Sequence, residues 1–310
     1  MARVNDMTAT ERTSRTSAAV DAAIGAAREL GLDVTGATVL HDLFSVVVRL
    51  EPAPVVVRVP TVVPATETLD TLARRQVHEL AVTAWLAARG VPVLRPSPLV
   101  PAVPVQRDGL SMTFWEYTEE DRTAEPDYAA NAESTARLHA ALRDYPGELG
   151  FLASADPDGV TAGLDLLAGR PDLLPAGDVA RARAEWTALE PAVRSRDAFA
   201  ERFPDVDLQP IHGDCPPANM FAAVDGIRYA DFELVTLGPV EWDLAALGPE
   251  LEAAYDRGAV AAGIRRLRPD VLEFVNAVGV LRAVSTLALV PQLPELAQYL
   301  QPVVERWRNA

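Results

Sequence analysis

The sequence predicts an α+β fold with two lobes, an antiparallel sheet with a helix followed by a larger and mostly helical lobe. Three valine-rich runs at residues 37–40, 45–50 and 54–59 have the composition and length of strands. Residues 69–88 then repeat apolar side chains at helical spacing. From Thr118 onward almost every segment has helical spacing, so we expect the boundary between the lobes to lie just before this residue.

The N-terminal lobe, residues 17–117, is expected to begin with a helix and to end with a strand. Residues 1–16 are polar and predict a flexible lead, whereas residues 17–30 have helical apolar spacing. Glu51-Pro52-Ala53-Pro54 favours a turn, so the strands on either side of it are expected to pair as an antiparallel hairpin. The last strand is expected over residues 110–117.

The C-terminal lobe, residues 118–310, is expected to be helical except near its middle. Alanine-rich segments with helical spacing occupy residues 128–142, 161–168, 178–194 and 244–254, and two or three more helices follow. The exception is residues 212–231, which predict a loop and a tight hairpin. This stretch concentrates most of the polar residues that suggest chemistry.

Composition excludes several classes of protein. The 310 residues carry a net charge of -16, which argues against a nucleic-acid partner because such proteins need a basic face to neutralise phosphates. There is no lysine, so a Schiff base to a lysine amine is unavailable. One cysteine and four scattered histidines make a zinc site improbable and an internal disulfide impossible. The acidic balance would attract cationic small molecules.

No segment of the sequence predicts a membrane partner. Residues 1–16 lack the apolar run of a signal peptide. The most apolar segment, residues 271–290, contains Glu273, Asn276 and Arg282 and is therefore expected to be a buried helix rather than a membrane span. A cytoplasmic protein is expected.

The hairpin within residues 212–231 is expected to bring two oxygen-bearing side chains together. Asp225-Gly226 is the dipeptide that best tolerates the positive φ angles of a type I′ turn. Counting outward from this turn places Met220 opposite Asp231 and Asn219 beside it. An amide oxygen and a carboxylate suit Mg²⁺, which shares its ligand shell with water and nucleotide phosphates.

Asp214 precedes Asn219 by five residues and is expected on the preceding loop. There it could accept a proton from a substrate hydroxyl while a metal ion neutralises phosphate charge. Protein kinases have the same order: His-x-Asp, an Asn five residues after the Asp, and then an Asp that holds magnesium. His212, Asp214, Asn219 and Asp231 match that spacing, with Gly213 where protein kinases carry Arg.

Three motifs together resemble the aminoglycoside phosphotransferase-like family of small-molecule kinases. They are His212-Gly-Asp-x-x-x-x-Asn219, then Asp231-Phe-Glu, then Gly238-Pro-Val-Glu-Trp-Asp243-Leu-Ala. The resemblance extends over most of the chain from about residue 35 and fades in the C-terminal helices. It implies a bilobal protein-kinase-like fold with ATP between a nucleotide-binding lobe and a catalytic and substrate lobe.

The resemblance also implies roles for individual residues. Asp214 would be the catalytic base, and Asn219 and Asp231 would be the magnesium ligands. Arg58, where relatives carry Lys, would pair with Glu79 on the helix.

Further positions follow from the same resemblance. Trp115-Glu116-Tyr117 would form the hinge whose backbone groups bind adenine. His212 is expected to support the loop from a buried position rather than to act as a base, and its neighbour Cys215 to be incidental. Asp243 is expected either to cap a helix or to brace the loop.

We therefore expect an ATP- and Mg²⁺-dependent transfer of the γ-phosphoryl group to a hydroxyl of a small molecule, such as an aminoglycoside or another cationic acceptor. A metabolite kinase of the choline, homoserine or sugar type is an alternative. Another is a nucleotide-binding, pseudokinase-like regulator, suggested by Arg58 and by the first strand turn, residues 41–45, which has no glycine. A metal-dependent phosphoesterase is less well supported, because it would need more metal ligands. The sequence does not determine the oligomeric state.

Overall fold

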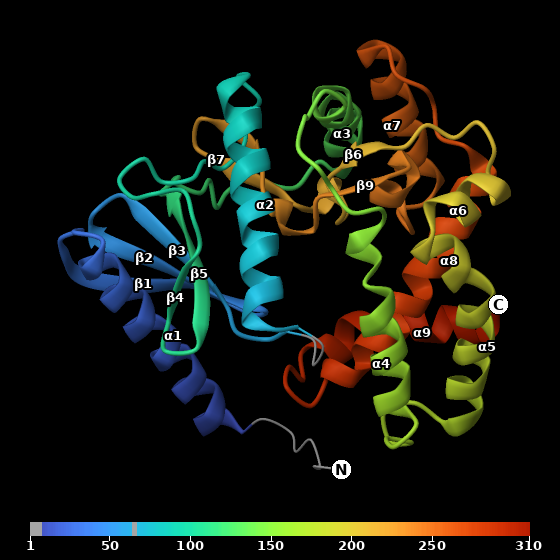
Figure 1. The fold of residues 1–310 in the computed structure, drawn as a ribbon, viewed down its shortest axis with the longest axis horizontal. Coiled ribbons are helices and arrows are strands. Elements are labelled where there is room, and N and C mark those ends of the chain that lie inside the picture. Colours follow the sequence, from blue (N-terminus) through green and yellow to red (C-terminus); the bar gives the residue numbers. More distant parts are fainter. Residues whose placement is uncertain (1–7, 64–66) are drawn as a thin grey trace. The chain divides into compact units, whose positions relative to one another are not determined.

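The computed structural model describes residues 8–63 and 67–310, which form two compact units (Figure 1). The first comprises the described residues up to Asp121 together with Ala223–Arg228 and Pro291–Pro294. The second comprises Arg122–Ala222, Tyr229–Val290 and Glu295–Ala310. An antiparallel sheet with helices in the first unit and a mostly helical second unit confirm the predicted α+β fold.

The sheet of the first unit has five strands in the order β1-β2-β3-β5-β4, and every neighbouring pair is antiparallel. The strands are β1 (Val34–Asp42), β2 (Ser45–Pro52), β3 (Val55–Pro60), β4 (Val105–Arg107) and β5 (Leu110–Glu116). The three valine-rich runs therefore form the strands that their composition predicts. The predicted hairpin between β2 and β3 is present, with Leu50 opposite Val55.

The two faces of this sheet contact different helices. Val57 and Val59 of β3 are fully buried and share a core with the alanines of α1 (Ala9–Glu29), which lies along the sheet in Figure 1. Because side chains alternate along a strand, Arg58 between these valines points to the other face. There it meets α2 (Leu69–Ala88), which packs against β5.

Helix α1 begins earlier than the sequence suggests. The helix starts at Ala9, where the side chain of Thr8 accepts from the backbone N–H of Glu11 and the Glu11 carboxylate accepts from that of Thr8. The predicted flexible lead is therefore wrong for residues 9–16, and residues 1–7 lie outside the described part of the chain. The first turns of α1 are polar, so they carry no apolar period that could reveal a helix.

The second unit contains most of the helices. They are α3 (Tyr128–Leu142), α4 (Pro157–Leu167), α5 (Ala176–Arg194), α6 (Arg196–Arg202), α7 (Pro249–Ala262), α8 (Pro269–Thr286) and α9 (Leu296–Asn309). Helix α3 has the predicted bounds. The helix predicted over residues 244–254 is wrong in its first half, because η4 (Val240–Leu244) is a short 3₁₀ turn and α7 starts only after Gly248, with Pro249 in its first turn.

Helix α8 is apolar and long enough to cross a membrane by length and composition alone, and half of its most apolar window is buried inside the protein. It packs against α4, α5 and α9, and Phe274, Val278 and Leu281 on α8 belong to the main core of this unit. These contacts agree with the prediction of a buried helix, because the apolar side chains meet other helices.

Short strands position the motif residues. Strand β6 (Gln209–Ile211) pairs antiparallel with β9 (Thr236–Gly238), so the loop that follows β6 lies beside the segment that precedes β9. Strands β7 (Met220–Ala223) and β8 (Gly226–Tyr229) form the predicted two-stranded ribbon.

The turn of this ribbon is not the predicted one. Val224 and Asp225 form it, and Gly226 opens β8 with a φ of 123°. A type I′ turn at Asp225-Gly226 needs a positive φ at both residues, but Asp225 has none. As a result the ribbon shifts its register, and the backbone N–H of Ala230 donates to the Asn219 carbonyl oxygen at 3.0 Å. Asn219 still ends up beside the residue that precedes Asp231.

Candidate active site

The loop of residues 212–219 is held at its start by Asp243, a fully buried residue of η4. One carboxylate oxygen of Asp243 accepts from the backbone N–H of His212 at 2.8 Å, and the other accepts from that of Gly213 at 2.8 Å. Asp243 therefore braces the loop, and the alternative prediction of a helix cap is wrong. Trp242, the neighbour of Asp243, donates from its indole Nε1 to the Gly213 carbonyl oxygen at 3.0 Å.

A buried histidine continues this network. The Nε2 atom of His139, on α3, lies 2.8 Å from Asp243, and its Nδ1 atom lies 2.8 Å from the hydroxyl of Tyr255 on α7. Burial raises the pKa of Tyr255, so its hydroxyl keeps its proton and donates it to Nδ1, while Nε2–H donates to Asp243. The sequence does not single out His139, because nothing in the chain signals a contact between residues more than a hundred positions apart.

His212 supports the loop from its other side. Its ring is fully buried and packs on Phe232, with the ring centroids 4.7 Å apart. The Nε2 atom lies 2.8 Å from the Ala230 carbonyl oxygen, and because a carbonyl only accepts, this nitrogen carries the proton and donates. The ring is thus hydrogen-bonded to backbone next to Asp231, in the buried position that we expected.

Gly213 stands where only glycine fits. Its φ is 89°, and a Cβ atom added there would lie 1.8 Å from the Leu234 carbonyl oxygen. The loop and the segment after Asp231 are therefore in backbone contact. This contact explains why glycine occupies the position at which protein kinases carry arginine, since any side chain would push the two segments apart.

Asp214 and Asn219 are directly linked. The Asn219 side-chain nitrogen donates to the Asp214 carbonyl oxygen at 2.5 Å and lies 3.3 Å from its carboxylate. This geometry leaves the Asn219 amide oxygen for another partner. Asp231, which follows Ala230 and adopts a left-handed φ of 62°, brings a second oxygen donor to the same end of the ribbon.

This pair of oxygen donors fits Mg²⁺. An amide oxygen and a carboxylate are the hard ligands that this ion prefers, and it completes its shell with water and phosphate oxygens. Among the described residues there is no cluster of three or more His, Cys, Asp or Glu side chains suited to a metal. The candidate site thus rests on Asn219 and Asp231 alone.

The rest of the loop is also fixed. The side chain of Asn131, on α3, donates to the Pro217 carbonyl oxygen at 2.9 Å. Cys215 adopts a left-handed φ of 39° just before the short turn η2 (Pro216–Ala218). Burial, together with the charge of Asp214, raises the pKa of the Cys215 thiol to about 12, so the thiol remains protonated and makes a poor nucleophile.

The first unit contains the other predicted residues. The Arg58 guanidinium lies 3.0 Å from the Glu79 carboxylate, so the expected pair is formed in the structure. Glu79 is almost fully buried, and Arg58 is partly buried. A pair shielded in this way fixes the guanidinium against α2.

The predicted hinge lies at the end of β5. The backbone N–H of Glu116 donates to the Arg95 carbonyl oxygen at 2.8 Å, and that of Tyr117 donates to the Pro54 carbonyl oxygen at 2.9 Å. Adenine contacts from these two residues would therefore have to use their carbonyl oxygens. The ring of Tyr117 is held by Arg49, whose guanidinium lies 4.0 Å from the ring centroid, and Trp115 donates from Nε1 to Thr113.

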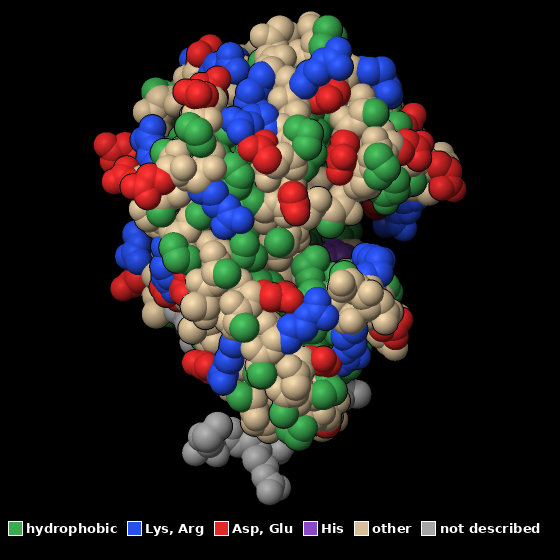
Figure 2. Space-filling view, turned by 90° about the vertical axis from the view of Figure 1, so that its right-hand side faces the viewer, with side chains coloured by type: hydrophobic (Ala, Val, Ile, Leu, Met, Phe, Trp, Pro, Cys, Tyr) green, Lys and Arg blue, Asp and Glu red, His purple; other side chains and the backbone are tan. Residues whose placement is uncertain are grey.

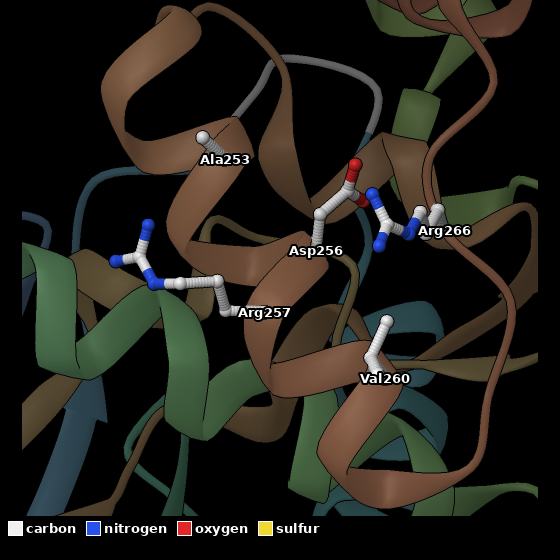
Figure 3. A pocket seen from close by; sticks show the side chains of 5 residues that line it. All are labelled: Ala253, Asp256, Arg257, Val260 and Arg266. Carbon is white, nitrogen blue, oxygen red and sulfur yellow. The ribbon is translucent and has the colours of Figure 1, made fainter.

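A shallow depression lies elsewhere on the second unit, along α7 (Figure 3). It is lined by Ala253, Asp256, Arg257, Val260 and Arg266. In Figure 3 the side chains of Asp256 and Arg266 point toward one another, while Arg257 points away from them. The depression includes none of the predicted site residues.

Comparison with known protein families identifies the chain. The profile of the phosphotransferase enzyme family, APH, matches residues 43–275, which is three quarters of the sequence. The chain belongs to this family. It is therefore a phosphotransferase, as the three motifs indicated, and the match covers every residue of the candidate site. No curated protein sequence is similar enough to count as a relative.

Solved structures of low sequence identity share the fold of this phosphotransferase. The GDP and kanamycin complex of APH(2")-IIia has a TM-score of 0.60 and 13% identity, covering 92% of this chain and 97% of that one. A choline kinase from Streptococcus pneumoniae has a TM-score of 0.57 and 15% identity, covering 92% and 99%. An aminoglycoside phosphotransferase from Streptomyces rimosus with ADP and streptomycin has a TM-score of 0.55 and 17% identity, covering 85% and 98%. These likenesses confirm the predicted protein-kinase-like fold.

Proposed function

We propose that this phosphotransferase moves the γ-phosphoryl group of ATP to a hydroxyl of a small molecule in the cytoplasm. The observation that carries the proposal is the braced loop of residues 212–219, in which Asn219 is hydrogen-bonded to Asp214, while the residue before Asp231 is hydrogen-bonded to Asn219. Asp243 accepts two hydrogen bonds from backbone N–H groups of the loop, and Trp242 and Asn131 each donate one to a backbone carbonyl oxygen. The His212 ring adds a fifth hydrogen bond, which it donates to the Ala230 carbonyl oxygen. A preorganised base and a pair of magnesium ligands are the parts that phosphoryl transfer requires.

Asp214 acts as the base in this proposal. Its carboxylate accepts the proton of the acceptor hydroxyl as the oxygen forms its bond to the γ-phosphorus and the bond to the β-phosphate oxygen breaks, which releases ADP. The amide nitrogen of Asn219 lies 3.3 Å from this carboxylate and orients it. Because Asn219 donates with its nitrogen, its oxygen is free to serve a metal ion at the same time.

Asn219 and Asp231 would hold Mg²⁺, which supplies positive charge to the phosphates of the nucleotide when it is bound. In the first unit, Arg58 would contact the nucleotide phosphates with its orientation set by Glu79. The carbonyl oxygens at Glu116 and Tyr117 would accept from the adenine amino group, and Trp115 would lie beside them. The structural neighbours bound to ADP, GDP and AMP support a nucleotide as the donor.

The acceptor is a small molecule rather than a nucleic acid. Arginine side chains lie among acidic and apolar ones on the face drawn in Figure 2, as expected for a chain with a net charge of -16. The structural neighbours include kinases named for aminoglycosides and for choline, so both classes of alcohol belong in the first screen.

The test compares the wild type with Asp214→Asn. ATP consumption is screened with Mg²⁺ over aminoglycosides, choline, hydroxy acids and sugars, and binding of Mg²⁺ and ATP is followed in parallel by thermal shift. We expect Asp214→Asn to lower kcat by about 10²- to 10⁴-fold, the usual effect of removing a general base, with nucleotide binding retained.

Asp225→Asn is the matched control, because Asp225 lies in the same stretch but is exposed and paired with Arg228. This variant should turn over ATP like the wild type. An Asp214→Asn enzyme with full activity would remove Asp214 from the mechanism. Binding of ATP without turnover of any alcohol would favour the regulator without transfer activity.

A further inference from the structure

Arg282 is a cation beside the candidate base that no part of the mechanism above uses. It lies on α8, and its guanidinium stands over the ring of Trp242 at 5.3 Å from the ring centroid. Trp242 in turn donates to the Gly213 carbonyl oxygen, one residue before Asp214. A short chain of contacts therefore connects the Arg282 side chain with the base.

The electrostatic surroundings agree with this position. Burial lowers the pKa of the Arg282 guanidinium, while the charges of Asp214 and Asp156 raise it. Asp156 begins helix α4, where its side chain accepts from the backbone N–H of Gly159 at 3.1 Å.

The fold fixes the position of the backbone that carries Arg282. Helices α4 and α8 touch closely, since a Cβ atom added at Gly163 would lie 2.8 Å from the Ser285 carbonyl oxygen. Ser285 is one turn after Arg282 on the same helix, so the backbone that carries Arg282 cannot move far relative to α4. The aromatic ring of Trp242 then limits where the guanidinium can lie.

The guanidinium nevertheless lacks a close anionic partner. Within the described residues, no carboxylate lies within 4.0 Å of Arg282, and its guanidinium donates no hydrogen bond to another residue. Other arginines of this unit are paired, for example Arg265 with the buried Glu241 at 2.5 Å. Because no described residue uses these donors, they are available to a planar anion that accepts two of the N–H groups.

A second unsatisfied polar group lies next to the same loop. The Ser154 hydroxyl is buried and has no hydrogen-bond partner among the residues that the structure describes, and its Cβ atom would lie 3.1 Å from a Cβ added at Gly213. Ser154 belongs to η1 (Ala153–Ala155), which leads directly into Asp156. Unsatisfied buried hydroxyls are uncommon in proteins, so this one also indicates polar space beside the loop.

We propose that Arg282 binds an anionic group of the acceptor, so that the substrate is an alcohol that carries a carboxylate or a similar anion close to the hydroxyl that Asp214 deprotonates. This inference rests on the proposed phosphotransferase activity and names the class of acceptor for the same site. It argues against an acceptor that is purely cationic next to its reacting hydroxyl, because the guanidinium would repel it. A zwitterion with its carboxylate toward Arg282 remains compatible with the acidic surface of the protein.

The test uses pairs of alcohols that differ only in the anion. L-Homoserine and 3-aminopropan-1-ol share a hydroxyl and an ammonium group, but only the first has a carboxylate. Glycerate and glycerol form a second pair. ATP turnover with Mg²⁺ is measured for all four alcohols with wild type, Arg282→Ala and Arg282→Lys, and Arg183→Ala serves as control because Arg183 is an exposed arginine paired with Asp165.

We expect the wild type to prefer the carboxylate-bearing member of at least one pair. Arg282→Ala should raise KM for that member by about 10- to 100-fold and erase the preference, while KM for ATP and for the uncharged or cationic member stays the same. Arg282→Lys should recover part of the preference, because it restores the charge but not the bidentate geometry. Arg183→Ala should behave like the wild type.

Two results would overturn the inference, and they are distinguishable. Turnover of alcohols with no preference for the anionic member, or a loss in Arg282→Ala that is equal for both members of a pair, would leave the phosphotransferase standing and reduce Arg282 to a structural residue. Absence of turnover with every alcohol, despite binding of Mg²⁺ and ATP, would refute the proposed function and this inference with it.

Discussion

Replacing Asp243 by Asn should uncouple the loop from its support with almost no change in shape. One carboxylate oxygen of Asp243 serves both the His212 N–H and His139 Nε2, and the other serves the Gly213 N–H, each at 2.8 Å. Asparagine keeps one acceptor oxygen, but an amide NH₂ group replaces the other oxygen. This NH₂ group is a donor and would face another donor. If the oxygen stays where two bonds are made, the Gly213 N–H loses its partner inside a fully buried site.

The magnitude follows from the bonds lost. A hydrogen bond to a charged group contributes about 1.5–3 kcal/mol, and an unsatisfied buried donor adds a similar cost, so we expect the second unit to lose about 2–4 kcal/mol in free energy of unfolding. The effect on activity follows from position, because a displacement of about 1 Å can lower the rate about 10²-fold. We therefore expect kcat to fall by about 10²-fold while KM for ATP changes little.

The assay that isolates this effect is amide hydrogen exchange of the peptide that contains residues 212–214, combined with urea unfolding and ATP turnover. Exchange in that peptide should accelerate in Asp243→Asn before any other part of the second unit is affected. Asp270→Asn is the control, since Asp270 is an exposed carboxylate paired with Arg268. If Asp243→Asn matched the wild type within twofold in exchange and in kcat, the bracing role would be refuted.

Three further predictions concern single contacts. Gly213→Ala should destabilise the second unit by about 2–4 kcal/mol and abolish activity, as measured by urea unfolding and turnover, because the new Cβ would meet the Leu234 carbonyl oxygen. Cys215 should react with iodoacetamide at pH 8 on the order of 1,000-fold more slowly than a free thiol, as followed by intact mass, because its pKa is raised to about 12 and thiolate accumulates only as the pH approaches that value. Arg58→Met should cost the first unit about 1–3 kcal/mol in unfolding free energy, and Arg58→Met with Glu79→Met should recover part of that loss.

Each of these predictions has a control and a result that contradicts it. Gly177→Ala, with nothing within 4 Å of its new Cβ, should stabilise α5 slightly, so equal effects at Gly177 and Gly213 would exclude the steric argument. Rapid labelling of Cys215 in the folded protein would mean that the thiol is exposed and ionised. If the losses in free energy of unfolding caused by Arg58→Met and Glu79→Met simply added in the double variant, the two side chains would not stabilise one another.

Local patterns predicted those parts of the fold that depend on neighbouring residues. Helix α2 has the predicted bounds because its apolar spacing runs over its whole length, and the spacing of Asp214, Asn219 and Asp231 is a property of one short stretch. The turn at Val224–Asp225 was misplaced by one residue because the glycine accepts a positive φ on either side of the turn.

Contacts between distant segments had no such signal. His139 lies more than a hundred residues from Asp243, and its alanine-rich helix shows only a packing pattern. In the sequence, Arg282 interrupts an apolar segment. The interruption correctly indicated that this segment is a buried helix rather than a membrane span, but it did not indicate what the Arg282 side chain contacts. Only the packing of α8 against α4 and Trp242 shows that the interruption lies beside the base.

Backbone strain explains why the loop needs so many braces. Four residues other than glycine adopt a left-handed φ around the candidate site: Leu152, Asp156, Cys215 and Asp231. Each such residue costs on the order of 1–3 kcal/mol, so the loop would relax if nothing held it. The hydrogen bonds that Asp243, Trp242 and Asn131 make with the loop oppose that relaxation. They set the direction of the Asp214 carboxylate, which directly precedes the strained residue Cys215. Removing a brace should therefore release strain as well as break a bond, so the stability lost in Asp243→Asn should lie toward the lower end of the expected range of about 2–4 kcal/mol.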